Sequence, residues 1–215
     1  MRTKIIRNRL FDHHKLPVRT KLRLLRTARI LRRGGLIAHH TGTLPGVAAV
    51  ARNQAAARQL CNFKQRRGPF LLLADSVHSA LGLCIHLPSA LRKTMSQAWP
   101  GPATFIVPAA GADATDITPA CFGGRTIGGR AIAIRVDADL ACRYLAHLVG
   151  GLLISSSLNR KKQPVQAPSR RLRMRWHRHL NAQISFGDSS GCASSLLKWS
   201  SAHLHILRGS MPAQH

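Results

Sequence analysis

Apolar and polar residues follow two periods along the chain, one typical of helices and one of strands. Residues 18–33 predict a helix, and Gly34 and Gly35 should end it, because glycine tolerates the dihedrals that follow a helix. The apolar face of this helix consists of Val18, Leu22, Leu25, Ala28 and Leu31. A short strand should follow at 36–41, and the alanine-rich stretch 47–63 predicts a second helix.

A continuous apolar run, a β-branched and aromatic stretch and an alternating segment predict strands in the rest of the chain. The strands are expected at 69–75, within 99–110, at 131–136 and 152–157, and as a pair joined by a turn within 184–209. Helices are expected at 76–83, 88–98 and 139–150, and loops at 111–130 and 158–175. Strands that alternate with helices predict an α/β fold whose sheet is at least partly parallel.

The length of 215 residues and the 45% of apolar residues allow one sizeable domain with its own core. The pattern divides the chain into a basic N-terminal extension (1–17), a single domain (18–209) and a short tail (210–215). No internal repeat is visible, and no apolar stretch approaches the ~20 residues of a membrane span.

The charge balance is extreme, with 33 Lys and Arg against seven acidic residues. All seven acids are Asp, the chain contains no Glu, and the net charge is +26. Such a charge attracts polyanions, and phosphate-bearing partners are the obvious candidates. Arginine far outnumbers lysine, which suits forked contacts to phosphate, although a coding bias toward arginine is an alternative explanation.

Cysteine and histidine usage argues against a disulfide scaffold and against a metal site. The five Cys are scattered, odd in number and never in a C-x-x-C pair, which favours a reducing compartment. The twelve His lack partner ligands at metal-site spacings, so we predict no metal ligands. The N-terminus lacks the apolar region of a secretory signal, and its Arg-rich start leaves an organelle transit peptide open. The cytoplasm is the expected location.

Four stretches, read in order, resemble one family. They are AHHTGTLPGV (38–47), KQRRGPFLLLA (64–74), WPGPATFIVPA (99–109) with AIAIRV (131–136), and LLISSSLNRKKQP (152–164). The order and spacing are similar to those of the YrdC-like family of threonylcarbamoyl-AMP synthases, of which this chain would be a divergent member. The family motifs are a P-T-E turn, a K-x-R cluster, W-P-G-P-x-T, a V-R-V strand and an S-x-S-A-N turn. The resemblance spans about residues 20–209.

This resemblance implies an open, twisted mixed α/β sheet with flanking helices and a basic concave face. It also implies an activity, the joining of L-threonine, bicarbonate and ATP with Mg²⁺ into threonylcarbamoyl-AMP with release of pyrophosphate. A tRNA threonylcarbamoyl-transfer complex would then modify tRNA, and RNA binding, to tRNA or double-stranded RNA, is associated with the family. The predicted partners therefore include RNA and exclude a membrane.

The resemblance assigns the ATP-binding residues Lys64, Arg66, Ser157, Asn159 and Ser194, with Lys64 and Arg66 in the catalytic role. Cations beside a turn with free backbone N–H groups suit phosphate. Cations at a helix C-terminus are also common without any ligand, because they interact favourably with the helix dipole. The hydroxyl and amide groups at 157–159 follow a strand, where α/β sheets bind ligands, or they form an ordinary Ser/Asn turn.

The residues that the resemblance assigns to threonine are Thr41, Arg135 and Ser155. Arg135 would hold the threonine carboxylate through a bidentate contact, and an edge-strand Arg that points to solvent is the alternative. Trp99 is expected to pack under the Pro-Gly turn in a structural role.

Several positions depart from the family motifs. P-T-E reads His40-Thr41-Gly42, so the glutamate is missing at position 42. S-A-N reads Ser157-Leu158-Asn159, with a bulkier residue in the middle. These changes fit either a divergent enzyme or a noncatalytic RNA-binding paralogue that serves ribosomal RNA maturation.

The RNA-binding alternative depends on the net charge, the cationic helix 18–33 and the segment RRLRMRWHRH (170–179). Trp176 in that segment is a candidate for stacking on a base, and the segment also fits a solvated Arg-rich helix. A third alternative, binding to a membrane surface, depends on the amphipathic helix alone.

Overall fold

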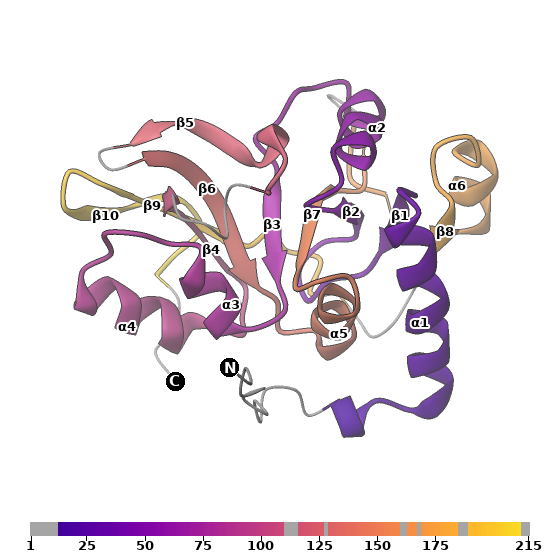
Figure 1. The fold of residues 1–215 in the computed structure, drawn as a ribbon, viewed down its shortest axis with the longest axis horizontal. Coiled ribbons are helices and arrows are strands. Elements are labelled where there is room, and N and C mark those ends of the chain that lie inside the picture. The colour runs from indigo at the N-terminus through magenta and orange to yellow at the C-terminus, as the bar shows by residue number, and fades with distance from the viewer. Residues whose placement is uncertain are drawn as a thin grey trace, which may run out of the picture.

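The computed structural model describes residues 13–109, 116–126, 129–159, 163–166, 169–184 and 189–211, which form an α/β fold (Figure 1). The helices are α1 (Val18–Arg32), α2 (Gln54–Lys64), α3 (Val77–Gly82), α4 (Ser89–Ala98), α5 (Leu140–Leu148) and α6 (Arg170–Arg175), with short 3₁₀ helices at His13–Lys15 and Pro119–Cys121. The strands are β1 (Ile37–His39), β2 (Gly46–Val50), β3 (Leu71–Ala74), β4 (Ala103–Ala109), β5 (Phe122–Thr126), β6 (Gly129–Val136), β7 (Leu152–Ser157), β8 (Ala182–Gln183), β9 (Ser195–Ser200) and β10 (His203–Arg208).

All of these strands belong to one mixed sheet. Its order is β10-β9-β4-β6-β3-β7-β2-β1-β8, and β5 also pairs with β6. The pairs β3–β6, β4–β9 and β1–β8 are parallel, whereas β2–β7, β3–β7 and β4–β6 are antiparallel. The prediction of a mixed α/β sheet with flanking helices is confirmed.

Helices cover both faces of this sheet. On one face, Ile37, Ala48, Leu73 and Leu153 pack against α1 and α5, which lie side by side in Figure 1. On the other face, alternate residues of the same strands pack with α2, α3, α4 and the segment around Trp176. This alternation follows from the two-residue period of a strand and buries apolar side chains on both faces.

Three helices begin at a capping side chain that the sequence supplies. Asn53 Oδ1 accepts a hydrogen bond from Ala56 N, Ser76 Oγ accepts from Ser79 N, and Asp139 Oδ1 accepts from Cys142 N. Each cap satisfies a backbone N–H that would otherwise lack a partner. The cap at Asp139 also fixes the start of α5 directly after strand β6.

Two predictions for the first half of the chain are wrong. Residues 46–50 form strand β2 and not the start of a helix, because pairing with β1 and β7 overrides the helix propensity of alanine. In α1 the buried residues are Leu24, Thr27, Ala28 and Leu31, whereas the predicted face is exposed at Val18, Leu22 and Leu25. The helix packs against α5 through a stripe rotated from the predicted one.

Two predictions for the second half are also corrected. The stretch predicted as a loop at 111–130 contains β5, and the one at 158–175 contains α6. Trp176 is only 3% exposed and packs edge-to-face on Phe63 at 5.0 Å between ring centroids. It therefore belongs to the core and cannot stack on a base as it lies here.

The prediction for Trp99 is confirmed. This residue is buried, its Nε1 donates to Ala103 O at 2.8 Å, and its ring contacts Phe105. The division into an extension, one domain at 18–209 and a tail stays a prediction, and residues 1–12 and 212–215 lie outside the described residues. Within the described chain, no helix combines the length and apolarity that crossing a bilayer would need.

Candidate active site

A cavity of about 190 Å³ lies on the sheet face that α1 and α5 cover in part. Its walls come from segments far apart in the sequence: the 41–46 turn, Arg66, Leu71, the ends of β6 and β7, and residues 193, 194 and 208. The lining residues include Thr41, Arg66, Arg135, Ser155, Ser157 and Ser194, all of which the sequence motifs had singled out. Lys64 and Asn159 contact this wall from behind through Ser157.

Lys64 fastens the bend after β7. It is the last residue of α2 and is 4% exposed. Its Nζ donates to Ser157 O at 2.6 Å, to Asn159 O at 2.5 Å and to Asn159 Oδ1 at 2.6 Å. Because an ammonium has three N–H donors, these contacts use all of them. Burial, with a smaller effect from the Arg66 charge, lowers the pKa of Lys64 to about 8.

Arg66 faces the cavity from the turn that follows α2. Gln65, in the left-handed conformation with φ 54°, ends the helix and redirects the chain. The Arg66 guanidinium lies 4.4 Å from the Phe70 ring centroid, and it donates to Pro69 O at 3.0 Å and to Ser156 Oγ at 3.4 Å. These contacts hold an exposed cation beside β7, and burial of part of the side chain lowers its pKa.

Arg135 is a buried cation in the middle of the sheet, so the alternative of a solvent-facing edge residue is wrong. It is 3% exposed and forms an ion pair with Asp137, with 2.6 Å between Nη2 and Oδ2. Its Nη1 donates to Thr43 Oγ1 at 2.8 Å, and its Nε has no partner. A guanidinium with donors to spare at a cavity wall suits a carboxylate ligand.

The 41–46 turn is held by its own hydroxyl groups. Thr41 Oγ1 donates to Leu44 O at 2.8 Å and accepts from Thr43 N at 3.2 Å. The backbone of residues 189–191 lies against the other side of this turn, since Ser190 N and Gly191 N donate to Gly42 O and Thr43 O. The turn is therefore fixed from two sides before any ligand binds.

His39 supports Ser155 from below the cavity. Its Nε2 lies 3.1 Å from Ser155 Oγ, and the imidazole is 2% exposed. Gly46 makes this pair possible, because a Cβ there would lie 2.8 Å from His39 Nε2. Burial lowers the pKa of His39 to about 4, against the opposite effect of the Asp137 carboxylate, so the ring is neutral at pH 7.

This buried imidazole should make the protein sensitive to acid. An unfolded His takes up a proton near pH 6.5, whereas the folded His39 does so only near pH 4. The free energy of unfolding should therefore fall by about 3 kcal/mol as the pH decreases from 6.5 to 4. Denaturant titrations at several pH values should show a smaller decrease for His39→Gln. If the free energy of unfolding of His39→Gln decreased as much as that of the unmodified protein, His39 would not be the group responsible. His203→Gln, at an exposed position, is the matched control.

Arg208 and Thr43 line the cavity, and the sequence motifs did not identify them. Arg208 ends β10 and its Nε donates to Ser194 O at 3.1 Å. Ser194 in turn contacts Thr104 Oγ1 at 2.9 Å. Only the Arg-Gly pair that ends the last strand could have pointed to Arg208, because its partners in the cavity are distant in sequence.

The side chains of the described residues do not form a metal site. No group of three or more His, Cys, Asp or Glu comes together among them. The nearest carboxylate, Asp137, already binds Arg135, Gly42 N and Asp139 N. These residues do not fit a protein-bound Mg²⁺, so any Mg²⁺ would arrive with the nucleotide as part of the substrate.

Comparison with known proteins decides the family. The family model for Sua5, YciO and YrdC proteins, described as telomere recombination, matches residues 29–210. This chain belongs to the Sua5/YciO/YrdC family. A threonylcarbamoyl-AMP synthase of Thiobacillus denitrificans is 36% identical over 132 residues, which cover 60% of this chain and 66% of that relative. A threonylcarbamoyl-AMP synthase of Alkalilimnicola ehrlichii is 32% identical over 164 residues, or 74% of this chain and 81% of the relative.

Solved structures agree with this Sua5/YciO/YrdC fold. P. abyssi Sua5 complexed with L-threonine matches 87% of this chain with a TM-score of 0.76 at 20% identity. E. coli YciO matches 88% of this chain with a TM-score of 0.73 at 16% identity. The match covers 89% of YciO but only 54% of Sua5, so the chain spans about half the length of that Sua5.

Proposed function

We propose that this member of the Sua5/YciO/YrdC family is a threonylcarbamoyl-AMP synthase. It would form threonylcarbamoyl-adenylate from L-threonine, bicarbonate and ATP and release pyrophosphate, in support of threonylcarbamoyladenosine modification of tRNA. The observation that carries the proposal is the cavity in which Arg66, Arg135 and Arg208 converge with the hydroxyl groups of the 41–46 turn and β7. Relatives that are about a third identical over the aligned residues and are named threonylcarbamoyl-AMP synthases support the same conclusion.

The buried end of the cavity suits threonine. Arg135 would bind the carboxylate, since it is charged, fixed by Asp137 and Thr43, and each of its two Nη atoms carries a second N–H. Thr41 and Ser155 would contact the rest of the amino acid, with His39 holding the Ser155 hydroxyl. P. abyssi Sua5, which shares this fold, has been crystallised in complex with L-threonine, and this supports threonine as the ligand here.

The exposed end suits a triphosphate. Arg66 and Arg208 line it and would bind phosphate oxygens, and Ser157, Asn159 and Ser194 would contact the nucleotide, with Lys64 holding the 157–159 bend. The volume of about 190 Å³ is below the ~300–1,000 Å³ of typical ligand pockets. We therefore expect the nucleotide to extend beyond the cavity.

The reaction needs cations more than a base. The carbamate formed from threonine and bicarbonate is an anion, and its oxygen must attack the α-phosphorus of ATP while pyrophosphate leaves. Because both reactants are negatively charged, the main barriers are repulsion and alignment. Three arginines around one cavity lower both barriers without an acidic side chain.

Product formation tests this proposal directly. The protein is incubated with ATP, Mg²⁺, threonine and ¹³C-bicarbonate, and the products are separated by mass spectrometry. We expect a threonine-dependent adenylate that carries one ¹³C atom. Detection of AMP or ADP alone, with no labelled adenylate at any enzyme concentration, would reject the synthase assignment.

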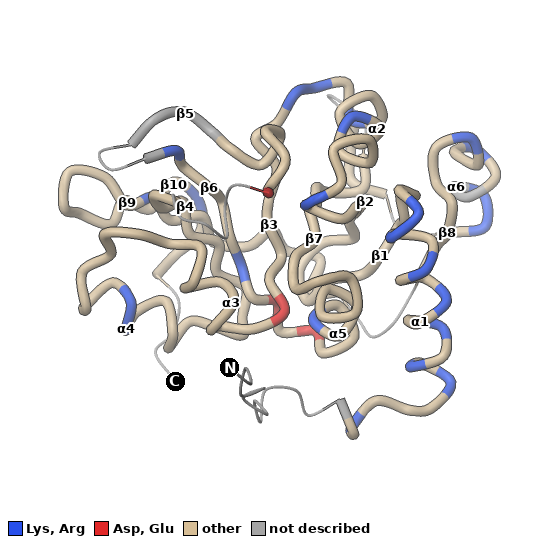
Figure 2. The backbone as a smooth tube through the Cα atoms, in the orientation of Figure 1, with Lys and Arg blue, Asp and Glu red and all other residues tan. Residues whose placement is uncertain are grey.

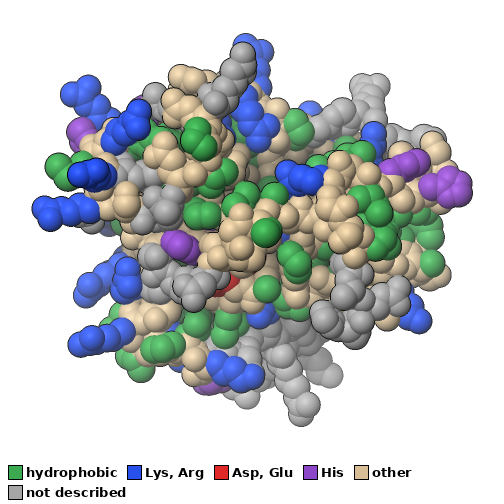
Figure 3. Space-filling model, turned by 180° about the vertical axis from the view of Figure 1, so that it is seen from behind, with side chains coloured by type: hydrophobic (Ala, Val, Ile, Leu, Met, Phe, Trp, Pro, Cys, Tyr) green, Lys and Arg blue, Asp and Glu red, His purple; other side chains and the backbone are tan. Residues whose placement is uncertain are grey.

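RNA binding is a second candidate function, favoured by one observation. Residues 18–33 contain seven Lys or Arg and residues 170–179 contain five Arg, with no acid in either segment. Figure 2 places these cations along α1 and around α6 at the same end of the molecule, and Figure 3 shows them from behind. Just after the two segments, two hydrogen bonds connect the chain, Leu36 N to Asn181 Oδ1 and Asn181 N to Leu36 O. We call residues 18–33 and 170–179 the basic edge.

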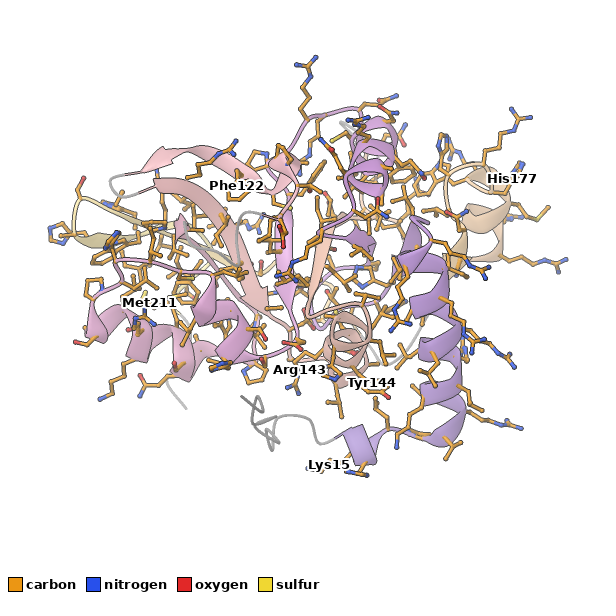
Figure 4. All side chains as sticks on the ribbon, viewed as in Figure 1. Lys15, Phe122, Arg143, Tyr144, His177 and Met211 are labelled. Atoms are coloured by element: carbon orange, nitrogen blue, oxygen red, sulfur yellow. The ribbon has the colours of Figure 1, made fainter. Side chains whose placement is uncertain are left out.

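The basic edge is exposed to a partner. Arg19, Arg26, Arg171 and Arg178 are exposed, and the His177 side chain at the α6 end points away from the protein in Figure 4. Counter-ion release would make RNA binding here steeply dependent on salt. The edge could accept a tRNA or double-stranded RNA while the cavity works on small substrates.

Salt titration of RNA affinity checks this candidate. Binding of a tRNA should weaken as salt rises, and Arg19→Gln/Arg26→Gln should reduce the slope of log K against log salt by about 1.5. The control Arg92→Gln/Lys93→Gln on α4 removes the same charge, also from exposed positions, and should change the slope less. Equal slopes for the two pairs, or binding to anionic vesicles but not to tRNA, would contradict the candidate.

Further partners follow only from the proposed activity. An unstable adenylate has to be passed to a tRNA threonylcarbamoyl-transfer complex, so we propose a transient association with one. We also propose a cytoplasmic location, where ATP and tRNA are abundant; the five cysteines, all free, accord with reducing conditions.

A further inference from the structure

Asp137 connects two parts of the cavity wall that come from distant segments. Its Oδ2 pairs with Arg135 Nη2 at 2.6 Å, and its Oδ1 accepts from Gly42 N at 2.7 Å and from Asp139 N at 3.0 Å. The side chain is 2% exposed. One carboxylate therefore ties the end of β6 to the 41–46 turn.

Gly42 leaves room for this carboxylate. A Cβ at position 42 would lie 3.2 Å from Asp137 Oδ1, so any side chain there would begin against it. The P-T-E motif has a glutamate at this position, which here would bring two carboxylates together. A second carboxylate close to the buried Asp137 would raise the cost of keeping both groups ionised.

Asp137 also determines what Arg135 can offer a ligand. In the part of the chain that the structure describes, Asp137 is the only acid paired with any of the three arginines of the cavity. Asp137 accepts from Nη2 of Arg135 and Thr43 accepts from Nη1, and each of these nitrogens carries a second N–H. The ion pair fixes the guanidinium plane, on which bidentate recognition of a carboxylate depends.

We propose that Asp137 is a positioning residue for threonine and supplies the carboxylate that the chain lacks at position 42. It orients Arg135 and locks it to the 41–46 turn, and it touches no substrate itself. This inference rests on the proposed function, because it assumes that Arg135 binds the threonine carboxylate.

The substitution Asp137→Asn tests the orientation of Arg135 while the hydrogen bonds to the neighbouring backbone are kept. The amide oxygen can still accept from Gly42 N and Asp139 N, but the amide NH₂ cannot accept from Arg135. Threonine affinity, measured by calorimetry, should fall about tenfold or more, whereas ATP affinity should stay within about twofold. Asp116→Asn, at an exposed position, is the matched control and should leave both affinities unchanged.

A double-mutant cycle shows whether Asp137 acts through Arg135. In an Arg135→Lys background, Asp137→Asn should weaken threonine binding by less than about twofold. The swap Gly42→Glu/Asp137→Ala should bind threonine more tightly than Gly42→Glu alone, because the second carboxylate is gone. Thermal unfolding of each variant verifies that it is folded.

Three results would each overturn the inference. They are additive effects in this cycle, equal losses of threonine and ATP affinity, and a Gly42→Glu/Asp137→Ala variant that binds threonine no better than Gly42→Glu. If the unmodified protein binds ATP but not threonine, the proposed function fails as well. If it binds threonine and Asp137→Asn binds equally well, only this inference fails.

Discussion

Replacing Lys64 with methionine should reduce kcat/KM for ATP by a factor on the order of 10². The substitution removes the three hydrogen bonds by which Lys64 holds the 157–159 bend, and the bonds within the bend itself would remain. Ser157 and Asn159, the proposed nucleotide contacts, would lose their fixed positions. Steady-state kinetics with ATP varied at saturating threonine measures this loss.

Lys64 should also set the upper pH limit of activity. The pKa of Lys64 is about 8, so the ammonium loses its proton as the pH rises through that value, and kcat/KM for ATP should fall. The residual rate of Lys64→Met should be flat over the same interval. Lys93→Met is the matched control, because it removes an exposed lysine from α4, which packs on the other sheet face. A loss of similar size in both variants would argue against a special role for Lys64.

Replacing Arg135 with lysine should raise the KM for threonine about 10- to 100-fold with a smaller change in the KM for ATP. Lysine keeps the buried charge beside Asp137 but cannot form the forked contact that a carboxylate prefers. A retained charge avoids the large cost of an unpaired Asp137, so the protein should stay folded.

The comparison with Arg66→Lys makes this prediction specific. Arg66 lies at the exposed end of the cavity, near Ser156, so its change should raise the KM for ATP and leave that for threonine nearly unchanged. Kinetics with each substrate varied in turn would separate the two effects. If both variants raised the same KM, the division of the cavity into a threonine end and a phosphate end would be wrong.

The sequence was most informative where one segment decides its own structure. The apolar runs at 131–136 and 152–157 are strands because their residues are buried on both faces of the sheet. The helix 18–33 was found as well, but its buried stripe was not. Leucines lie on both sides of α1, buried at Leu24 and Leu31 and exposed at Leu22 and Leu25, so the apolar pattern alone did not reveal which residues face α5.

The parts that could not be predicted depend on distant partners. Strand β2 is Ala-rich and reads as a helix, and only its pairing with β1 and β7 makes it a strand. For the site, the motifs identified the six wall residues that the structure brings together. Asp137 and His39 escaped notice, because an isolated Asp or His gives no sign of a partner about 90 or more positions away, such as Gly42 for Asp137. Arg208 escaped notice as well, because it lies outside the family motifs.

Adenylate formation requires that one arginine-lined cavity binds threonine and ATP together. Pyrophosphate release from ATP and Mg²⁺, with threonine and bicarbonate each omitted in turn, measures this requirement most directly. We expect release only when all three substrates are present, and its loss in Arg66→Ala. Release that persists without threonine, or none with every substrate supplied to folded protein, would contradict a shared site for the two substrates.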